Sequence, residues 1–335
     1  MSKKQWVWLI VALVLFAAIG AYTAWQTNQA PDMLETIAGS FEGVYGGGFD
    51  AEFPYSDFIA RIDIEGTIVS DGGTTAMLTG GGFSESYILD YIDRLIDCPE
   101  NVGILLYIDS GGGEMGASDS VYLKLMDYKE ETGRPIYAYF DGTACSGAYY
   151  IAMAADEIWA NRNCLCVNIG VYISLYNLKG LFDRYGVEEI MVRSGPNKGI
   201  GSMGQEWTEE HQAIYQSIVD LYYDQFLEVV SAGRGMTKDT VRALDDGREM
   251  LALQALQRGF IDGICRWEEY ETQVQGYYGG DILVYEEEPA EMDLFLQYFQ
   301  NIFGNLKGMS SPSELEILRG LMDEPADLTV MAYAG

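Results

Sequence analysis

Residues 102–140 read "VGILLYIDSGGGEMGASDSVYLKLMDYKEETGRPIYAYF" and decide the fold class. Residues 102–109 form a nearly continuous apolar run, which is typical of a strand buried on both faces. A glycine turn follows, then a helical segment, and then a second apolar run at 134–140. This order of strand, glycine turn, helix and strand predicts parallel α/β layering.

The flanking sequence continues the same pattern. Residues 58–68 alternate isoleucine with charged residues, as a half-buried strand does, and residues 84–98 carry apolar side chains at helical spacing. The longest predicted helix starts at Thr208, a good N-cap followed by two acids, and ends at Gly233. No internal repeat is evident, so we expect one α/β domain. Further strands are expected at 157–161 and 188–194, and a further helix at 146–155. Within 250–264 we expect a helix that is stopped by Gly259 and followed by a short strand.

The first residues predict a membrane anchor. Residues 6–25 carry no charge and, at about 1.5 Å per residue, span about 30 Å, the thickness of a bilayer core. Two lysines precede this segment and acids follow it, which places the N-terminus in the cytoplasm and the rest outside. A cleaved signal peptide is the alternative, although its apolar region is normally shorter. We therefore expect a single-pass cell-membrane protein with most of the chain on the extracytoplasmic side.

These segments divide the chain into parts with different expected roles. The predicted parts are a cytoplasmic N-terminus (1–5), a transmembrane anchor (6–25), a linker rich in glycine and acids (26–54), the α/β domain (55–275) and a C-terminal extension (276–335), with a candidate helix at 295–303.

Charge and cysteine content exclude several classes of protein. The formal net charge is −31, from 51 acids against 20 bases, which argues against nucleic acid as a partner because phosphates require basic patches. Five cysteines cannot form a complete disulfide framework within one chain. Cys164 and Cys166 are too close together and too isolated for a zinc site. We expect buried free thiols, no metal and no cofactor.

Residues 141–150, "DGTACSGAYY", hold the candidate nucleophile, Ser146. This serine lies between small residues where a loop becomes a helix. The glycine turns after the two apolar strands should face one crevice, because sites form at the carboxyl ends of parallel strands. Amides of Gly112 or Gly113, together with that of Gly147, can then form an oxyanion hole. Neither P-loop nor GxGxxG spacing is present, so phosphate binding is disfavoured.

The base for such a serine is the open question. The single histidine, His211, lies in the acidic first turn of the long predicted helix and reads as a surface residue, so a Ser-His-Asp triad is not expected. A lysine can serve instead when its surroundings favour the neutral amine. Among the lysines, Lys198 stands out, because its glycine-rich loop contains no acid between Arg193 and Gln205. A solvated loop lysine remains the alternative.

Several ordered motifs match a known family. They are "IDSGGGEMGAS" (108–118), "CSGAYYIAMAADEIWAN" (145–161), "RSGPNKGIGSMGQEWTEEH" (193–211) and "DGREMLALQALQRGFIDGI" (246–264). Over roughly residues 55–270 the chain resembles the signal peptide peptidase A family, the S49 serine peptidases, in their short single-domain bacterial form.

The resemblance implies a fold, a mechanism and a setting. It implies the α/β fold shared with the Clp peptidase subunit and the crotonases, and a Ser/Lys dyad with Ser146 as nucleophile and Lys198 as general base. Members of the family are membrane-anchored oligomers that degrade signal peptides left in the membrane after secretion. We therefore expect a membrane-bound, homo-oligomeric serine endopeptidase with signal peptides as substrates.

Two positions depart from the family pattern. Gly111 replaces a proline in the first glycine turn, and Asn168 replaces a serine that holds the lysine amine. An amide oxygen can accept the same hydrogen bond, so Asn168 is the expected lysine-orienting residue. Two other functions stay open. One is a catalytically weak or inactive S49-like membrane scaffold, and the other is a crotonase-like acyl-transfer enzyme acting on acyl-CoA, which is not expected outside the cytoplasm.

Overall fold

The computed structural model of this 335-residue chain describes residues 53–70 and 83–287. The predicted anchor, nearly all of the linker and the candidate helix at 295–303 lie outside the described residues. Within the described ranges, no helix is both long enough and apolar enough to cross a membrane.

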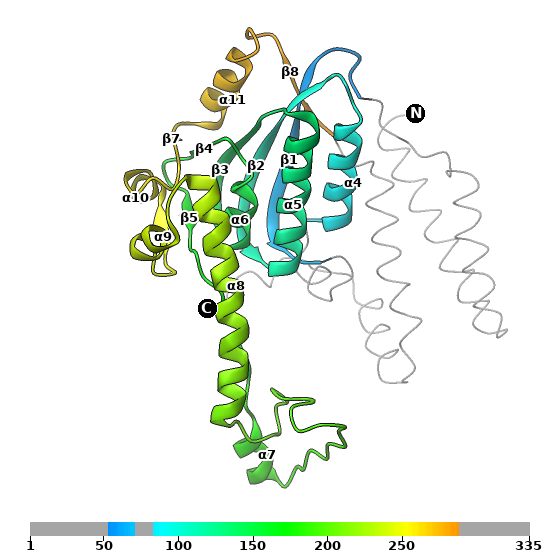
Figure 1. Ribbon diagram of the computed structural model, residues 1–335, viewed down its shortest axis with the longest axis vertical. Coiled ribbons are helices and arrows are strands. Elements are labelled where there is room, and N and C mark those ends of the chain that lie inside the picture. Colours follow the sequence, from blue (N-terminus) through cyan, green and yellow to red (C-terminus); the bar gives the residue numbers. More distant parts are fainter. Residues whose placement is uncertain (1–52, 71–82, 288–335) are drawn as a thin grey trace, which may run out of the picture. The chain divides into compact units, whose positions relative to one another are not determined.

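An eight-stranded sheet forms the centre of the described region (Figure 1). Its main path runs β6-β5-β3-β2-β1-β8, and β4 pairs with the first half of β3 and with β7. All pairs are parallel except β5 with β6, which confirms the predicted parallel α/β layering. The strands are β1 (Phe58–Ile68), β2 (Asn101–Gly113), β3 (Ile136–Cys145), β4 (Glu157–Ala160), β5 (Leu165–Val167), β6 (Glu249–Leu251), β7 (Gly263–Ile264) and β8 (Leu283–Glu286).

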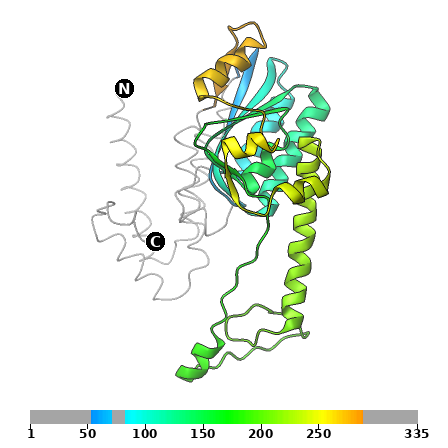
Figure 2. The ribbon, with the colours of Figure 1, turned by 90° about the vertical axis from the view of Figure 1, so that its left-hand side faces the viewer.

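Helices cover both faces of this sheet. Figures 1 and 2 show α4, α5, α6 and α8 on one side and α11 on the other. α6 packs on β1, β2 and β3, whereas α11 packs on β3 and β8. The helices are α4 (Glu85–Ile96), α5 (Met115–Thr132), α6 (Gly147–Ala152), α7 (Lys179–Tyr185), α8 (Glu209–Arg234), α9 (Lys238–Leu244), α10 (Ala252–Gln257) and α11 (Trp267–Gly276).

The apolar runs of the sequence become strands because both faces are covered. Successive side chains of a strand point to opposite faces. Ile104, Leu106 and Ile108 of β2 accordingly join the large core under the helices, while Leu105 joins a second cluster beneath α11. Each of these side chains is fully buried. A strand enclosed on both sides needs apolar residues at every position, and this explains the unbroken run at 102–109.

Most of the predicted elements are confirmed, and the exceptions have physical causes. Residues 188–194 were expected to form a strand but have no regular structure. The side chains of Ile190 and Val192 are 81% and 97% exposed, and no neighbouring strand pairs with them. The long helix continues to Arg234, because Gly235, with φ of 63°, supplies the left-handed cap. The predicted helix that stops at Gly259 and the short strand after it are present as α10 and β7, although the first residues of the predicted helix belong to β6 instead.

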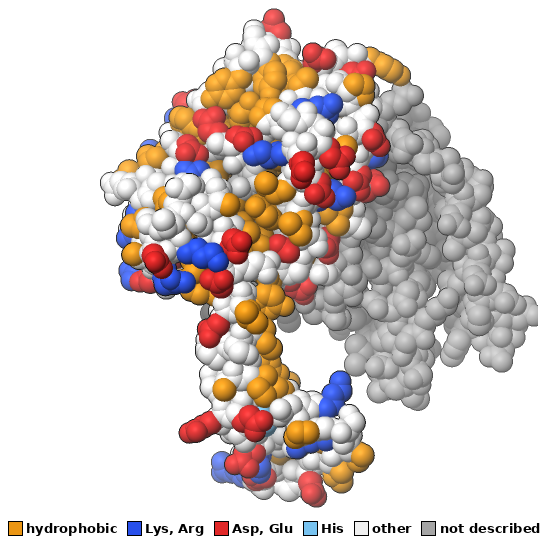
Figure 3. All heavy atoms as spheres, viewed as in Figure 1, with side chains coloured by type: hydrophobic (Ala, Val, Ile, Leu, Met, Phe, Trp, Pro, Cys, Tyr) orange, Lys and Arg blue, Asp and Glu red, His pale blue; other side chains and the backbone are white. Residues whose placement is uncertain are grey.

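Residues 171–208, here called the arm, connect β5 to α8. Figures 1 and 2 show the arm running along α8, with α7 near the amino-terminal end of that helix. Contacts to α8 fix its position, because the Tyr215 hydroxyl donates to the Ile200 carbonyl (3.0 Å). Figure 3 shows hydrophobic side chains gathered along α8 and the arm, outside the sheet and its cores.

Candidate active site

Ser146 lies at the junction of β3 and α6, as the sequence predicts. It is the N-cap residue of α6, with φ of 52° and ψ of −121°. Its amide donates to the Val167 carbonyl (2.9 Å), and its carbonyl accepts from the Tyr150 amide (2.9 Å). A positive φ at a residue other than glycine costs free energy, and such strain clusters at functional sites. Oγ makes no hydrogen bond within the described part of the chain, so the hydroxyl is free to react.

The turn at the end of β2 packs directly against this serine. Gly112 has φ of 94°, and a Cβ there would lie 2.6 Å from the Cys145 carbonyl oxygen and 2.7 Å from the Gly147 nitrogen. Glycine is therefore the one residue type that lets these two backbones approach so closely. The Gly112 amide donates to Ser110 Oγ (3.1 Å), so this donor is already engaged.

Gly113 and Gly147 supply the better pair of donors for an oxyanion. The Glu114 amide donates to the Ile68 carbonyl (2.7 Å) on the β1 side. Because successive amides of a strand point to opposite sides, the Gly113 amide points to the side of Ser146. Its nitrogen lies 3.3 Å from the point that a Gly147 Cβ would occupy. The Gly147 amide is in the first turn of α6, where helix donors lack intrahelical partners.

Asn168 also lies beside the nucleophile. It follows Val167, the residue whose carbonyl holds the Ser146 amide, and both residues have positive φ, 75° at Val167 and 57° at Asn168. The Asn168 side-chain Nδ2 donates to the Gly247 carbonyl (2.7 Å). The structure thus brings Gly112, Gly113, Gly147 and Asn168 together around Ser146, and three neighbouring non-glycine residues share the strain.

Cys145 precedes the nucleophile but does not compete with it. The thiol is buried at the carboxyl end of β3. Burial, reinforced by the charge of Glu249, raises its pKa to about 12, so it stays protonated at neutral pH. All five cysteines of the chain are free, and four of them are buried.

Lys198 does not lie near Ser146 of its own chain. Its loop packs beside the first turn of α8, where the Asn197 side-chain Nδ2 lies 3.4 Å from Glu210 Oε1. Near its other end, α8 contacts α6, where Gln225 Nε2 donates to the Tyr150 hydroxyl (3.0 Å). At about 1.5 Å per residue, the stretch of α8 between these contacts spans about 22 Å, several times the reach of a lysine side chain.

The single histidine is equally remote. His211 lies in the first turn of α8, where its amide donates to the Thr208 hydroxyl (3.2 Å) and its ring packs edge-on against Trp207, 5.9 Å between centroids. No triad of Ser146 with this histidine exists within the chain. The ring is half-buried against the indole, whereas the sequence predicts a solvated one.

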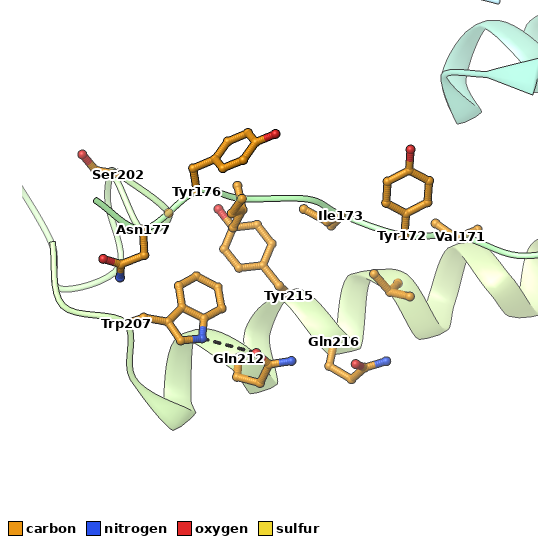
Figure 4. Close-up of a pocket in the computed structure, with 13 residues that line it drawn as sticks. Val171, Tyr172, Ile173, Tyr176, Asn177, Ser202, Trp207, Gln212, Tyr215 and Gln216 are labelled. Atoms are coloured by element: carbon orange, nitrogen blue, oxygen red, sulfur yellow. Dashed lines mark hydrogen bonds between the residues drawn. The ribbon is translucent and has the colours of Figure 1, made fainter. Parts of the chain in front are cut away.

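A groove lies between the arm and α8. Figure 4 shows Ile173 of the arm on the side of Tyr215 of the helix, with Trp207 at one end, whereas the rings of Tyr172 and Tyr176 point away from α8. The groove has a volume of about 580 Å³ and begins at Val171, close in sequence to Asn168. Mostly apolar side chains and a few amides line it. No pattern in the sequence indicates this groove, because the groove depends on how the arm lies on α8.

This arrangement fits a serine hydrolase, because a strained serine lies at the end of a parallel strand with two backbone donors beside it. The model of "Peptidase family S49" matches residues 128–276. The chain is 33% identical to "Putative protease slr0021" of Synechocystis sp., over 63% of this chain and 71% of that protein. It is 28% identical to "Putative signal peptide peptidase SppA" of Enterococcus faecium, over 79% and 78% of the two chains. The protein belongs to peptidase family S49.

A solved structure shows a weaker likeness. A ClpP1 mutant from Listeria monocytogenes superposes with a TM-score of 0.40 at 13% identity, covering 62% of this chain and 92% of that one. The relatives in family S49 define the activity: the protein is a serine peptidase. Membership in this peptidase family argues against the alternative of a crotonase-like acyl-transfer enzyme.

Proposed function

We propose that the protein is a membrane-anchored endopeptidase that cleaves residual signal peptides with a Ser/Lys dyad formed between two copies of the chain. Ser146 is the nucleophile, and Lys198 of a neighbouring copy is the general base. The observation that carries this proposal is the separation of the two residues along α8 within one chain.

The arm has the properties of a segment that contacts another copy. It extends from the body of the domain, and several of its large apolar side chains are exposed. These are Tyr172 (86%), Tyr176 (73%), Ile190 (81%) and Val192 (97%). Exposed apolar patches of this kind mark interaction sites. A symmetric ring of copies satisfies every arm in the same way, with each lysine delivered to the next serine.

The chemistry follows from the groups around Ser146. Neutral Lys198 removes the hydroxyl proton as Oγ attacks the peptide carbonyl, and the amides of Gly113 and Gly147 stabilise the oxyanion. The lysine then gives this proton to the departing amine. Water hydrolyses the acyl-enzyme, with the lysine again accepting the proton.

The proposed substrate and the proposed cellular location rest on separate observations. Signal peptides are apolar, and the groove that begins at Val171 is lined by Ile173, Tyr176 and Tyr215. The uncharged segment at 6–25 is the proposed anchor, and it places the catalytic domain on the extracytoplasmic side. There the enzyme would meet peptides left by secretion.

Complementation between inactive copies tests the proposal. Ser146→Ala and Lys198→Ala should each abolish cleavage of an apolar signal-peptide mimic. Differently tagged copies of the two variants, co-expressed as full chains and purified through both tags, should regain about one quarter of the wild-type rate. Each site then has about one chance in two of carrying the serine and one in two of meeting an intact lysine.

His211→Ala is the matched control and should keep wild-type activity. Full cleavage by Lys198→Ala would disprove the dyad. Two inactive parents that give no activity when mixed would instead mean that Lys198 reaches the serine of its own chain.

A further inference from the structure

A buried carboxylate lies behind the strained residues of the site. The Asp245 side chain is in the loop between α9 and β6, and the residue is 3% exposed. Its Oδ2 accepts the Ile169 amide (3.1 Å) and its Oδ1 accepts the Gly247 amide (2.6 Å). Burial raises the pKa of this carboxyl, opposed by these amides and by the charge of Arg258. Burying a carboxylate is costly, so the groups it holds must matter to the fold or to the site.

The two amides that Asp245 holds flank Asn168 on both sides. One belongs to Ile169, the next residue in the chain, and the other to Gly247, whose carbonyl accepts Asn168 Nδ2 (2.7 Å). A carbonyl can only accept a hydrogen bond, so the atom that faces Gly247 must be the amide NH₂ group. This contact leaves Asn168 Oδ1 as the group that is available to an incoming amine.

The orientation of this amide matters for a lysine base. An oxygen directed at the amine accepts one of its N–H groups and leaves the lone pair for the serine proton. An NH₂ group in the same place would donate to that lone pair and consume it. An asparagine therefore works here in one orientation only, and its neighbours must fix which one.

We propose that Asp245 is a positioning residue of the active site, which holds the Ile169 and Gly247 amides and thereby fixes Asn168 with its oxygen toward the lysine. The proposal rests on the proposed Ser/Lys dyad. Asp245 touches neither substrate nor reacting atoms, and acts through Gly247 and Asn168.

The test compares Asp245→Asn with Asp246→Asn in the full-length protein, using an apolar peptide amide as substrate. Asp246 is exposed and pairs with Arg248, so its variant makes the same charge change one residue away. Asp245→Asn should lower kcat roughly tenfold or more with KM unchanged, because misplacement of a catalytic group is costly. Asp246→Asn should match the wild type.

The pH profile of activity distinguishes a positioning role of Asp245 from an effect of Asp245 on stability alone. Loss of the Asn168 oxygen removes an acceptor that favours the ammonium form, so the midpoint of kcat/KM against pH should shift to lower pH in Asp245→Asn. A variant that is only partly folded would lower the whole curve without moving its midpoint. A midpoint equal to that of the wild type, in a folded variant, would overturn the proposal.

A second variant covers the case in which Asp245→Asn does not fold. Asn168→Ala keeps Asp245 and both of its amide bonds, and should shift the midpoint in the same direction. In the Asn168→Ala background, Asp245→Asn should have little further effect on kcat, because the two residues act on one group. An unshifted Asn168→Ala profile would refute the inference, whereas an active Lys198→Ala would refute the dyad itself.

Discussion

Replacement of Gly112 by alanine should damage both the stability and the activity of the enzyme. The backbone there has φ of 94°, and a side chain in such a conformation costs about 1–2 kcal/mol. The new Cβ would lie 2.6 Å from the Cys145 carbonyl and 2.8 Å from Ser146 Cβ, and overpacking of this kind costs about 1–3 kcal/mol. The two costs together come to about 2–5 kcal/mol, a large part of the about 5–15 kcal/mol that stabilises a typical domain.

Thermal unfolding and peptide cleavage measure the two effects. For a domain of this size, each kcal/mol lowers Tm by about 2–4 °C, so Gly112→Ala should unfold roughly 4–20 °C below the wild type. At a temperature where the variant is folded, kcat should fall roughly a hundredfold, because the turn carrying the Gly113 donor is displaced. Measurements at one fixed protein concentration keep any oligomerisation effect on Tm constant.

Gly111→Ala provides the matched control. Among the described residues other than its two chain neighbours, no heavy atom lies within 4 Å of an ideal Cβ at Gly111, and its φ is not in the positive region. Its Tm should stay within about 2 °C of the wild type or rise, since alanine restricts the unfolded chain. Equal Tm and equal kcat for the two variants would refute the argument that the close approach at Gly112 shapes the site.

Two further perturbations test the packing and the electrostatics of the domain. Leu125 is fully buried on α5, whereas Leu123 on the same helix is 52% exposed. In urea unfolding, Leu125→Ala should lower the free energy of unfolding by about 2–5 kcal/mol and Leu123→Ala by less than about 0.5 kcal/mol. Similar losses for the two variants would contradict the assigned core. Burial alone would raise the pKa of Asp262, but hydrogen bonds from Arg234 and the Ile158 amide outweigh it and lower that pKa. The stabilisation is therefore present at neutral pH and lost on acidification, so Arg234→Met should cost about 1–3 kcal/mol at pH 7 and progressively less below about pH 4. A cost that does not change between these pH values would show that the ion pair is not its source.

The central part of the fold could be predicted from the sequence because there local pattern and tertiary environment agree. β2 and β3 are enclosed on both faces, so every residue of their apolar runs reports the same environment. The glycine turns and the position of Ser146 follow from the same reasoning, because the carboxyl ends of neighbouring parallel strands meet at one edge.

The arm could not be predicted for the opposite reason. Residues 188–194 have the composition of a strand, but strand formation depends on a neighbour, and none pairs with them. The sequence singles out Lys198 as unusual, yet it carries no measure of the distance from Lys198 to Ser146. The role of Asp245 also could not be predicted, because an aspartate in an acidic loop has the sequence context of a surface residue. Only the structure shows that Asp245 is buried and accepts two backbone amides.

The length of α8 has a consequence for how such an enzyme is kept in check. On the proposed arrangement, a newly made copy holds a nucleophile without a base and cannot cleave other proteins. Proteolysis starts only when copies meet, so its rate per molecule rises with the concentration of the chain and falls on dilution. The separation of the two catalytic groups would then keep a single copy inactive, as a removable inhibitory segment does in other proteases.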